Sequence, residues 1–412
     1  MCFLFFFGGG LMALRFRFIG RSSVSLLILL TIFFSPARSA QNILKPDHDT
    51  ISLKHELTRT YQMAYAFLKK KQNPDGSWSN PEFPALTGLT VYALLTSPEY
   101  INADKKPDFI ARALDYIISS AHENGAIYKE GVSNYSTSIC VLALLATKDA
   151  IFHPYIIKAR NYIATLQIDQ GKKGVSDKSF DGGIGYGTKN HSDIFNTCIA
   201  LEAIKSSQFL ESNDRTSVYG GLKNLKKTTL NWEAALKFIE RCQNLSGYND
   251  QAWSSADEKN KGGFVTYPGF SKAGEDIFPS GTKALRSYGS MTYAGLLSFT
   301  FADLGKNDPR VQAAYEWLKK NYTLDENPGL GQQGLYYYYY TMAKALTLCG
   351  DDNFVLEDGQ RINWRQEMVV KFINNQKADG SWINETARWW ENDPVLVTSY
   401  VLISLNMITA FI

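Results

Sequence analysis

The phrase Gln376-Lys-Ala-Asp-Gly-Ser-Trp382 indicates a repeated fold, because the chain also contains Gln72-Asn-Pro-Asp-Gly-Ser-Trp78 near its other end. Each copy follows a segment with helical periodicity and precedes an apolar segment. Gln closes a helix, Asp-Gly supplies a turn with a left-handed residue, and Trp covers the corner. A corner that occurs at both ends indicates one repeated architecture between them.

Between the two phrases the sequence alternates two kinds of helical pattern. The first kind has apolar residues on one face, as at Leu57, Tyr61 and Leu68. The second kind is apolar or small all round, and such a helix must be buried on every side. About six pairs of the two kinds follow one another, and their apolar members span 84–95, 136–146, 195–204, 291–301, 336–348 and 395–405.

The apolar members also share a register. A threonine precedes a small residue by six positions at Thr87, Thr137, Thr197, Thr292 and Thr398, and only Tyr339 departs from this pattern. Small residues at matched positions allow neighbouring helices to pack closely. We therefore predict an all-α protein, an (α/α)6 toroid in which about six buried helices form an inner ring and about six one-sided helices form an outer ring.

Length and composition limit the number of domains and the classes of partner that we expect. The chain has 412 residues, of which 45% are apolar, and we expect one toroid domain over 41–412. Polar, Gly-rich insertions near 206–229 and 244–283 are expected to be loops at the ends of the toroid. A net charge of +3 with mixed signs gives no electrostatic case for nucleic acid.

The N-terminus has the features of an export signal. Arg15, Arg17 and Arg21 precede the apolar run 24–34, and Ala37-x-Ser39 is a small-residue cleavage site. We expect residues 1–40 to be a signal peptide or an N-terminal anchor, and the protein to be periplasmic or secreted. An uncleaved anchor would associate it with a membrane surface. No later apolar run reaches spanning length.

The Gln-x-x-x-Gly-x-Trp phrases and the Gly-Gly-x-Gly-Tyr-Gly run at 182–187, set between alternating helices, resemble the terpenoid cyclase/protein prenyltransferase family. The likeness is greatest to bacterial squalene-cyclase-like proteins with prenyltransferase/squalene oxidase repeats, and it covers residues 55–412. It implies an α/α toroid whose cavity opens where the inner helices begin. In that family the cavity holds an isoprenoid chain.

The family's chemistry carries over less well than its fold. The Asp-x-Asp-Asp motif that starts cyclisation in squalene–hopene cyclases is absent from the sequence, as is Asp-Asp-x-x-Asp. The zinc ligands of protein prenyltransferases fall on Arg286, Tyr288 and Tyr340, none of which is a usual zinc ligand. We therefore expect no metal and no cofactor. The resemblance implies a toroid that binds or cyclises an apolar isoprenoid substrate, an isomerase-type reaction, without the usual acid motif.

The starts of the inner helices are the expected places for chemistry, because free N–H groups and the helix dipole converge there. Asp193 and Asp393 are the candidate catalytic acids, and N-capping is the alternative role for both. His191 is a candidate substrate contact or an ordinary loop histidine. Arg286 could hold an anionic head group or pair with a neighbouring acid.

Aromatic side chains are the candidate binding surface. Rings that face the cavity would cradle an apolar chain or a carbocation, whereas the alternative is core filling with hydroxyls on backbone partners. The candidates are Phe83, Tyr288, Tyr293, Tyr336, Tyr340, Trp389 and Trp390. Two of them belong to a run of five tyrosines, 336–340, that passes all round a helix.

Two other functions stay open. The missing metal and acid motifs favour a non-catalytic module that binds a lipid or a partner protein. Export and aromatic platforms also fit a carbohydrate-active α/α barrel with paired carboxylates. An apolar cavity with one buried acid would favour the cyclase, a plugged cavity the binding module, and an open groove with two facing carboxylates the carbohydrate enzyme.

Overall fold

The computed structural model describes residues 48–103, 105–188, 190–211, 228–254, 257–279, 281, 283–350 and 354–409. This part of the chain is mostly helical, as predicted, and contains twelve α-helices. They are α1 (His48–Lys71), α2 (Pro84–Leu95), α3 (Asp108–Ser119), α4 (Ser133–Ala146), α5 (His153–Thr165), α6 (Ile194–Ser206), α8 (Trp232–Arg241), α9 (Gly289–Phe301), α10 (Pro309–Lys320), α11 (Leu335–Leu348), α12 (Trp364–Asn375) and α13 (Pro394–Thr409). The predicted signal segment, 1–40, lies outside the described residues.

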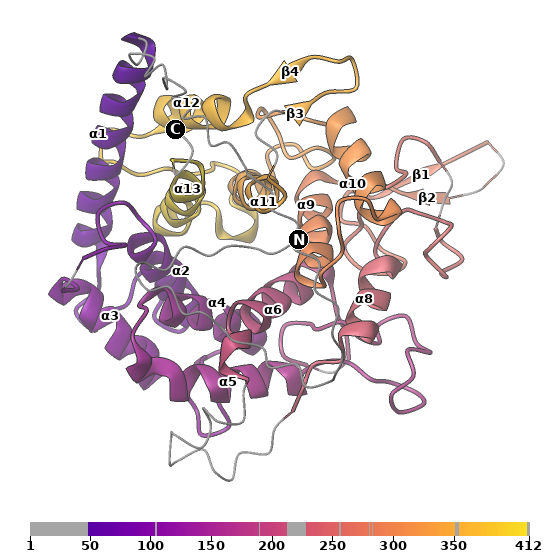
Figure 1. Cartoon of the computed structure of the whole chain (residues 1–412), viewed down its shortest axis with the longest axis horizontal. Coiled ribbons are helices and arrows are strands. Elements are labelled where there is room, and N and C mark those ends of the chain that lie inside the picture. Colours follow the sequence, from indigo (N-terminus) through magenta and orange to yellow (C-terminus); the bar gives the residue numbers. More distant parts are fainter. Residues whose placement is uncertain are drawn as a thin grey trace, which may run out of the picture. The chain divides into compact units, whose positions relative to one another are not determined.

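Six of the helices pack side by side in a closed cycle. α2 contacts α4, and the series continues through α6, α9 and α11 to α13, which returns to α2. The other six, α1, α3, α5, α8, α10 and α12, lie outside this cycle (Figure 1). Every residue of α2 except Tyr92 is buried, whereas α8 buries one face through Ala235, Phe238 and Ile239. The two sequence patterns therefore correspond to two layers.

A left-handed glycine closes the corner between an outer helix and the next inner helix at five places. These are Gly76, Gly125, Gly182, Gly262 and Gly380, with φ between +88° and +93°. A Cβ added at Gly76 would lie 2.5 Å from the carbonyl oxygen of Arg112 in α3, and one at Gly380 would lie 2.3 Å from that of Met63 in α1. Only glycine fits a corner pressed this closely against the next outer helix.

A glutamine ties each of four corners to the following outer helix or its cap. Gln72 Nε2 donates to the carbonyl oxygens of Gly76 at 2.9 Å and Phe109 in α3 at 2.7 Å. Gln376 repeats this pair near the end of the chain, donating to Gly380 at 3.0 Å and to Thr60 in α1 at 2.9 Å. Gln167 and Gln243 do the same at internal corners. The last repeat is thus joined to the first by the same bonds that join internal repeats.

The recurring threonines hold the corners from the inner layer. The backbone N–H groups of Trp78, Ile127, Ile184, Phe264 and Trp382 donate to the hydroxyls of Thr87, Thr137, Thr197, Thr292 and Thr398 at 2.9–3.2 Å. Tyr339, which departs from the pattern, instead donates its hydroxyl to the Leu324 carbonyl oxygen. The register therefore serves hydrogen bonding at buried corners, where an unpaired N–H would be costly.

Short hairpins and 3-10 turns complete the described structure. β1 (Glu275–Ile277) pairs antiparallel with β2 (Lys283–Leu285), and β3 (Phe354–Val355) with β4 (Arg361–Ile362). The first hairpin begins in the insertion 244–283, which was predicted to be a loop, and ends just beyond it at Leu285. The 3-10 turns are η1 (Ala150–Phe152), η2 (Gln208–Leu210) and η4 (Arg388–Trp390). No helix in the described ranges is both long and apolar enough to cross a membrane.

Candidate functional site

A cavity of about 260 Å³ lies among the first turns of the inner helices and the loops that precede them. By the same measure one water molecule needs about 10–15 Å³. Nine of the lining residues are aromatic: Phe83, Tyr135, Tyr186, Phe195, Tyr288, Tyr337, Trp389, Trp390 and Tyr400. Among the described lining residues three have a charged side chain, Asp193, Lys272 and Glu391. The cavity wall is therefore mainly apolar, with a few charges at defined places.

The aromatic rings contact one another around the cavity. Tyr135 stacks on Phe195 with ring centres 5.4 Å apart, and the edge of Tyr337 meets Phe195 at 5.1 Å. Tyr400 lies 6.0 Å from Tyr337, so the series reaches α13. Such faces carry partial negative charge and attract cations as well as apolar groups.

Asp193 is the buried acid of this wall and the N-cap of α6. Its Oδ1 accepts from the backbone N–H of Asn196 and its Oδ2 from the Asn196 side-chain amide, both at 2.8 Å. Burial raises the pKa of Asp193, while the bonds from Asn196 and the interactions with Lys272 and His191 act in the opposite direction. The net shift is upward, so the carboxyl holds its proton to higher pH than an exposed aspartate.

Glu391 is a second buried carboxyl at the cavity, which the sequence reasoning missed. Its Oε1 accepts from the N–H of Tyr337 at 2.8 Å, and its Oε2 from that of Tyr336 at 3.3 Å and from the Asn384 amide at 2.7 Å. Burial raises its pKa against these hydrogen bonds. Glu391 thus caps α11, whose own N-cap residue, Gly334, offers no side chain.

Trp389 and Trp390 stand at the rim in an unusual backbone conformation. Their φ angles are +56° and +65°, and their side chains are 37% and 46% exposed. A non-glycine residue in the left-handed region costs about 1–2 kcal/mol. The segment is held at its base, where the Asn384 N–H donates to the Glu391 carbonyl oxygen at 2.8 Å. Trp390 also meets the edge of Phe83 at 4.7 Å.

The structure brings together at this cavity five predicted residues: Asp193, Tyr288, Phe83, Trp389 and Trp390. Tyr288 is buried, and its hydroxyl lies 2.9 Å from that of Thr266, which also lines the wall. The elements that carry these residues are the starts of the inner helices and the loops before them, as the sequence reasoning expected.

The other predicted charged residues lie elsewhere. Asp393 caps α13 by accepting from the N–H of Val395 at 2.9 Å and is not a lining residue. His191 packs against the ring of Tyr267 at 4.3 Å. Arg286 pairs with Asp276 at 2.6 Å, which is the ion-pair alternative rather than the free head-group contact.

The five tyrosines of the run 336–340 face different sides of α11, and the sequence could not specify which of them face the cavity. Tyr337 lines the cavity, whereas Tyr336 meets the edge of Tyr339 at 5.6 Å and does not line it. Tyr340 follows Tyr337 on the same helical face, 6.0 Å away, and is not a lining residue either. Tyr293 is buried, with its ring 5.7 Å from that of Tyr338.

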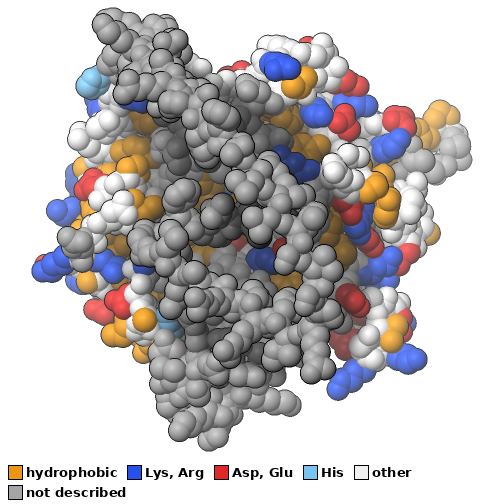
Figure 2. Space-filling model, viewed as in Figure 1, with side chains coloured by type: hydrophobic (Ala, Val, Ile, Leu, Met, Phe, Trp, Pro, Cys, Tyr) orange, Lys and Arg blue, Asp and Glu red, His pale blue; other side chains and the backbone are white. Residues whose placement is uncertain are grey.

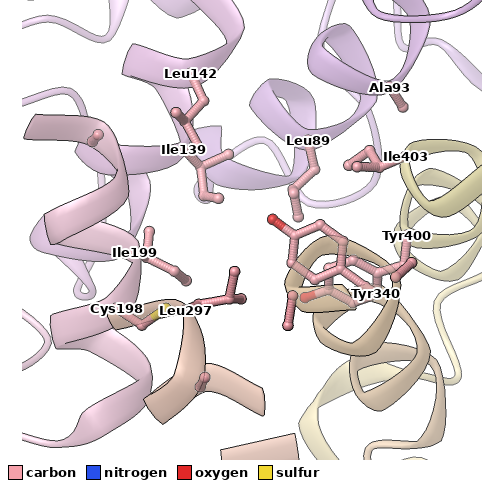
Figure 3. Packing of buried hydrophobic residues seen from close by; sticks show 14 of the residues in the cluster. Leu89, Ala93, Ile139, Leu142, Cys198, Ile199, Leu297, Tyr340, Tyr400 and Ile403 are labelled. Carbon is pink, nitrogen blue, oxygen red and sulfur yellow. The ribbon is translucent and has the colours of Figure 1, made fainter. Parts of the chain in front are cut away.

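Near Tyr340 the space between the inner helices is filled by side chains, which include a buried ion pair. Figure 3 shows Leu89, Ile139 and Leu297 directed toward the same region as Tyr340 and Tyr400. The Tyr340 and Tyr400 rings stack at 5.3 Å. Lys344 Nζ contacts both carboxylate oxygens of Glu202, at 2.6 and 2.8 Å, and the Tyr340 hydroxyl.

Lys272 is the other charged lining residue that the sequence reasoning missed. It lies in the insertion 244–283, which has no helical periodicity and gave no signal for it. Glu391 did have a signal, because it belongs to the Arg388–Pro394 motif, but Asp393 appeared the better helix start. Within the described residues no group of three or more His, Cys, Asp or Glu side chains is arranged to hold a metal ion.

Known proteins with a similar fold are found among solved structures. No protein-family model matches the sequence, and a comparison with curated proteins finds no match. A variant of type II terpene cyclase MstE from Scytonema, without ligand, has a TM-score of 0.51 and 13% identity over 88% of this chain and 99% of its own.

Two further structures have lower scores. Another MstE variant, in complex with geranylgeranyl dihydroxybenzoate as substrate, has a TM-score of 0.49 and 12% identity over 88% of this chain and all of its own. A possible member of the GH105 family from Salmonella enterica has a TM-score of 0.43 and 11% identity over 93% of this chain and all of its own. At these identities the likeness concerns the fold, which resembles that of α/α toroid proteins.

Proposed function

We propose that this chain is an exported, single-domain (α/α)6 toroid that binds an isoprenoid-type ligand in its aromatic cavity and cyclises it with Asp193 as the acid. The main support is the combination in one wall of nine aromatic side chains and a buried carboxyl with a raised pKa. The fold likeness to a type II terpene cyclase is consistent with this use of the cavity.

The proposed step needs no redox change. Asp193 donates its proton to one carbon of a ligand double bond, and the resulting cation closes a ring by attack of a second double bond. A proton lost from carbon to water at the rim ends the sequence, and the Asp193 carboxylate takes up one proton from water to restore the acid. The lining rings of Tyr337, Phe195 and Trp389 would stabilise positive charge along the chain. Water is disfavoured because most of the wall is apolar.

The chain offers a matched control for Asp193. Asp393 also caps an inner helix but does not line the cavity. We expect Asp193→Asn to abolish cyclisation of squalene or a polyprenyl diphosphate, measured by mass spectrometry of extracted products, and Asp393→Asn to retain it. Because Asn and Asp are similar N-caps, both variants should keep nearly the wild-type melting temperature. Equal activity of Asp193→Asn and wild type would exclude Asp193 as the acid.

Non-catalytic binding is the second candidate, and one observation favours it. Both carboxylate oxygens of Asp193 are engaged by Asn196, so capping alone accounts for its position. In that case native mass spectrometry would find a bound lipid, and no variant or condition would yield a product.

A carbohydrate-active barrel has less support. It requires two carboxylates free to act across the scissile bond, whereas the Glu391 carboxylate is occupied by the backbone of α11 and by Asn384. The mainly apolar wall also offers few partners for sugar hydroxyls.

A further inference from the structure

Two positive side chains converge on one ring at the mouth of the cavity. Lys272 Nζ lies 4.9 Å from the centre of the Trp389 ring, and the Arg388 guanidinium carbon lies 4.9 Å from the centre of the same ring. Lys272 and Trp389 both line the cavity. Lys272 and Arg388 are exposed residues at the rim, and the Lys272 ammonium is itself partly buried on the side of the cavity. Figure 2 shows that basic, acidic and hydrophobic side chains of the described residues alternate over the face in view.

Neither charge is neutralised by a carboxylate in the described part of the chain. Arg388 donates to the neutral Gln333 side chain at 3.0 Å, and Lys272 is attracted by Asp193 but forms no ion pair with it or with another acid among the described residues. The pKa of Lys272 is lowered, first by burial of its ammonium and also by the charge of Arg388, against the attraction of Asp193. Two like charges held together without a partner form an incomplete electrostatic arrangement, which an anion would complete.

The contrast with Arg286 makes this arrangement specific. Arg286 was the predicted head-group contact, but it is paired with Asp276 through two nitrogens. Arg388 and Lys272 are instead placed on the rim residue Trp389, whose backbone is held in the left-handed region. A strained, half-exposed aromatic residue that contacts two cations, neither in an ion pair within the described ranges, is typical of a ligand clamp.

Resting on the proposed function, we propose that the ligand is an isoprenoid chain with an oxyanion head group, a carboxylate or a phosphate, and that Lys272 and Arg388 hold this head at the rim while the chain occupies the aromatic cavity. The cations would then set which end of the chain enters first. The apolar chain would extend along the aromatic wall, and the charged end would remain near water at the rim.

A membrane surface is the competing occupant, since half-exposed tryptophans and basic residues also occur at membrane interfaces. The geometry favours a single ligand, because Lys272 lines the cavity and both cations are directed to one ring rather than spread over a face.

The test compares three probes of equal chain length, farnesol, farnesoic acid and farnesyl monophosphate, by quenching of tryptophan fluorescence. We expect wild type to bind the two anions at least tenfold more tightly than the alcohol. The double variant Lys272→Gln/Arg388→Gln should lose this preference and bind farnesol within twofold of wild type. Arg286→Gln is the matched control, and it should leave all three affinities unchanged. Added salt should weaken binding of the anions but not of the alcohol.

The outcomes separate the two proposals. Equal affinity of wild type for the alcohol and the anions would overturn the head-group site while leaving the aromatic cavity as a ligand site. Failure of all three probes to bind would overturn both. Co-sedimentation with anionic phosphatidylserine vesicles that is lost in the double variant, without any preference among the soluble probes, would assign the cations to a membrane surface instead.

Discussion

Replacement of Lys344 by methionine would expose the energetic role of the buried ion pair. The Lys344 and Glu202 side chains are only 3% and 9% exposed. Two nitrogen–oxygen contacts, at 2.6 and 2.8 Å, join them. Methionine nearly matches the length of the lysine stem, so the variant removes the charge and its bonds while largely preserving the packing.

The expected loss of folding free energy follows from the carboxylate that the variant leaves without a partner. Glu202 would be left in a nearly dry site without its counter-charge, and loss of one partner of a buried pair costs about 3–5 kcal/mol. Replacing both residues, in Lys344→Met/Glu202→Leu, removes the uncompensated charge and should recover most of that loss, since apolar replacements of buried pairs are often neutral or stabilising.

The measurement is the free energy of unfolding from urea titration at neutral pH. Lys205 is a suitable control, because it pairs with Asp303 at the same 2.6 Å but with side-chain exposures of 28% and 76%. Lys205→Met should cost about 0–1 kcal/mol. If Lys344→Met costs no more than Lys205→Met, or if the double variant is less stable than the single one, the assignment of the pair as a buried, mutually dependent unit is wrong.

This pair also predicts a pH effect. Burial alone would lower the pKa of Lys344, but the Glu202 carboxylate outweighs it and the net shift is upward. A raised lysine pKa contributes stability that is complete below the unfolded value, about 10.4, and is lost as pH rises through the folded value. Wild type should therefore lose stability above about pH 10.4 more steeply than Lys344→Met does.

Three more predictions concern the corners and the acid. Gly380→Ala should destabilise by more than Gly359→Ala, because both have φ above +80° but only the first would press a Cβ against the Met63 carbonyl oxygen; equal losses in urea unfolding would contradict the close approach. Thr398→Val should cost about 1–3 kcal/mol by leaving a buried N–H unpaired, and no loss would exclude the hydrogen-bond role. The pKa of Asp193 is raised, so the folded state keeps a proton that the unfolded state releases above about pH 3.9. The stabilisation of the folded state by this proton is therefore complete below that pH and is lost as pH rises through the pKa of Asp193 in the folded state. In urea titrations Asp193→Asn should flatten that decline, and an unchanged pH slope would contradict the shift.

The helical layers could be predicted because their signal is local. One-sided and all-round apolar patterns state directly how many sides of a helix are buried. The corners were harder to recognise. Gln72 and Gln376 each stand four residues before their glycine, whereas Gln167 and Gln243 are separated from Gly182 and Gly262 by insertions, so the shared corner emerges only in three dimensions.

The site could be predicted only in part. Asp193 and Trp389 adjoin recognisable helix starts, and capping signals place such residues near the mouth. Five identical tyrosines carry no information about helical phase, so the choice of Tyr337 over Tyr340 depends on how α11 is rotated. Lys272 lies in an insertion without helical periodicity, and the partner of Arg286 lies on the other strand of a hairpin. Residue spacing therefore predicted neither the place of Lys272 at the cavity nor the ion pair of Arg286.

The joint formed by Gln376 and Gly380 with α1 has a consequence for chain connectivity. Gln376 makes the same kinds of hydrogen bond between the last and the first repeat as the corner glutamines make between internal repeats. The hydrogen bonds between repeats therefore do not require the break in the chain to lie between α13 and α1. A circularly permuted gene that links the end of α13 to the start of α1 and opens the chain at an exposed turn, such as the one containing Gly359, should yield the same set of helices. Deletion of the final helical pair, by contrast, would leave an open arc with two unsatisfied faces.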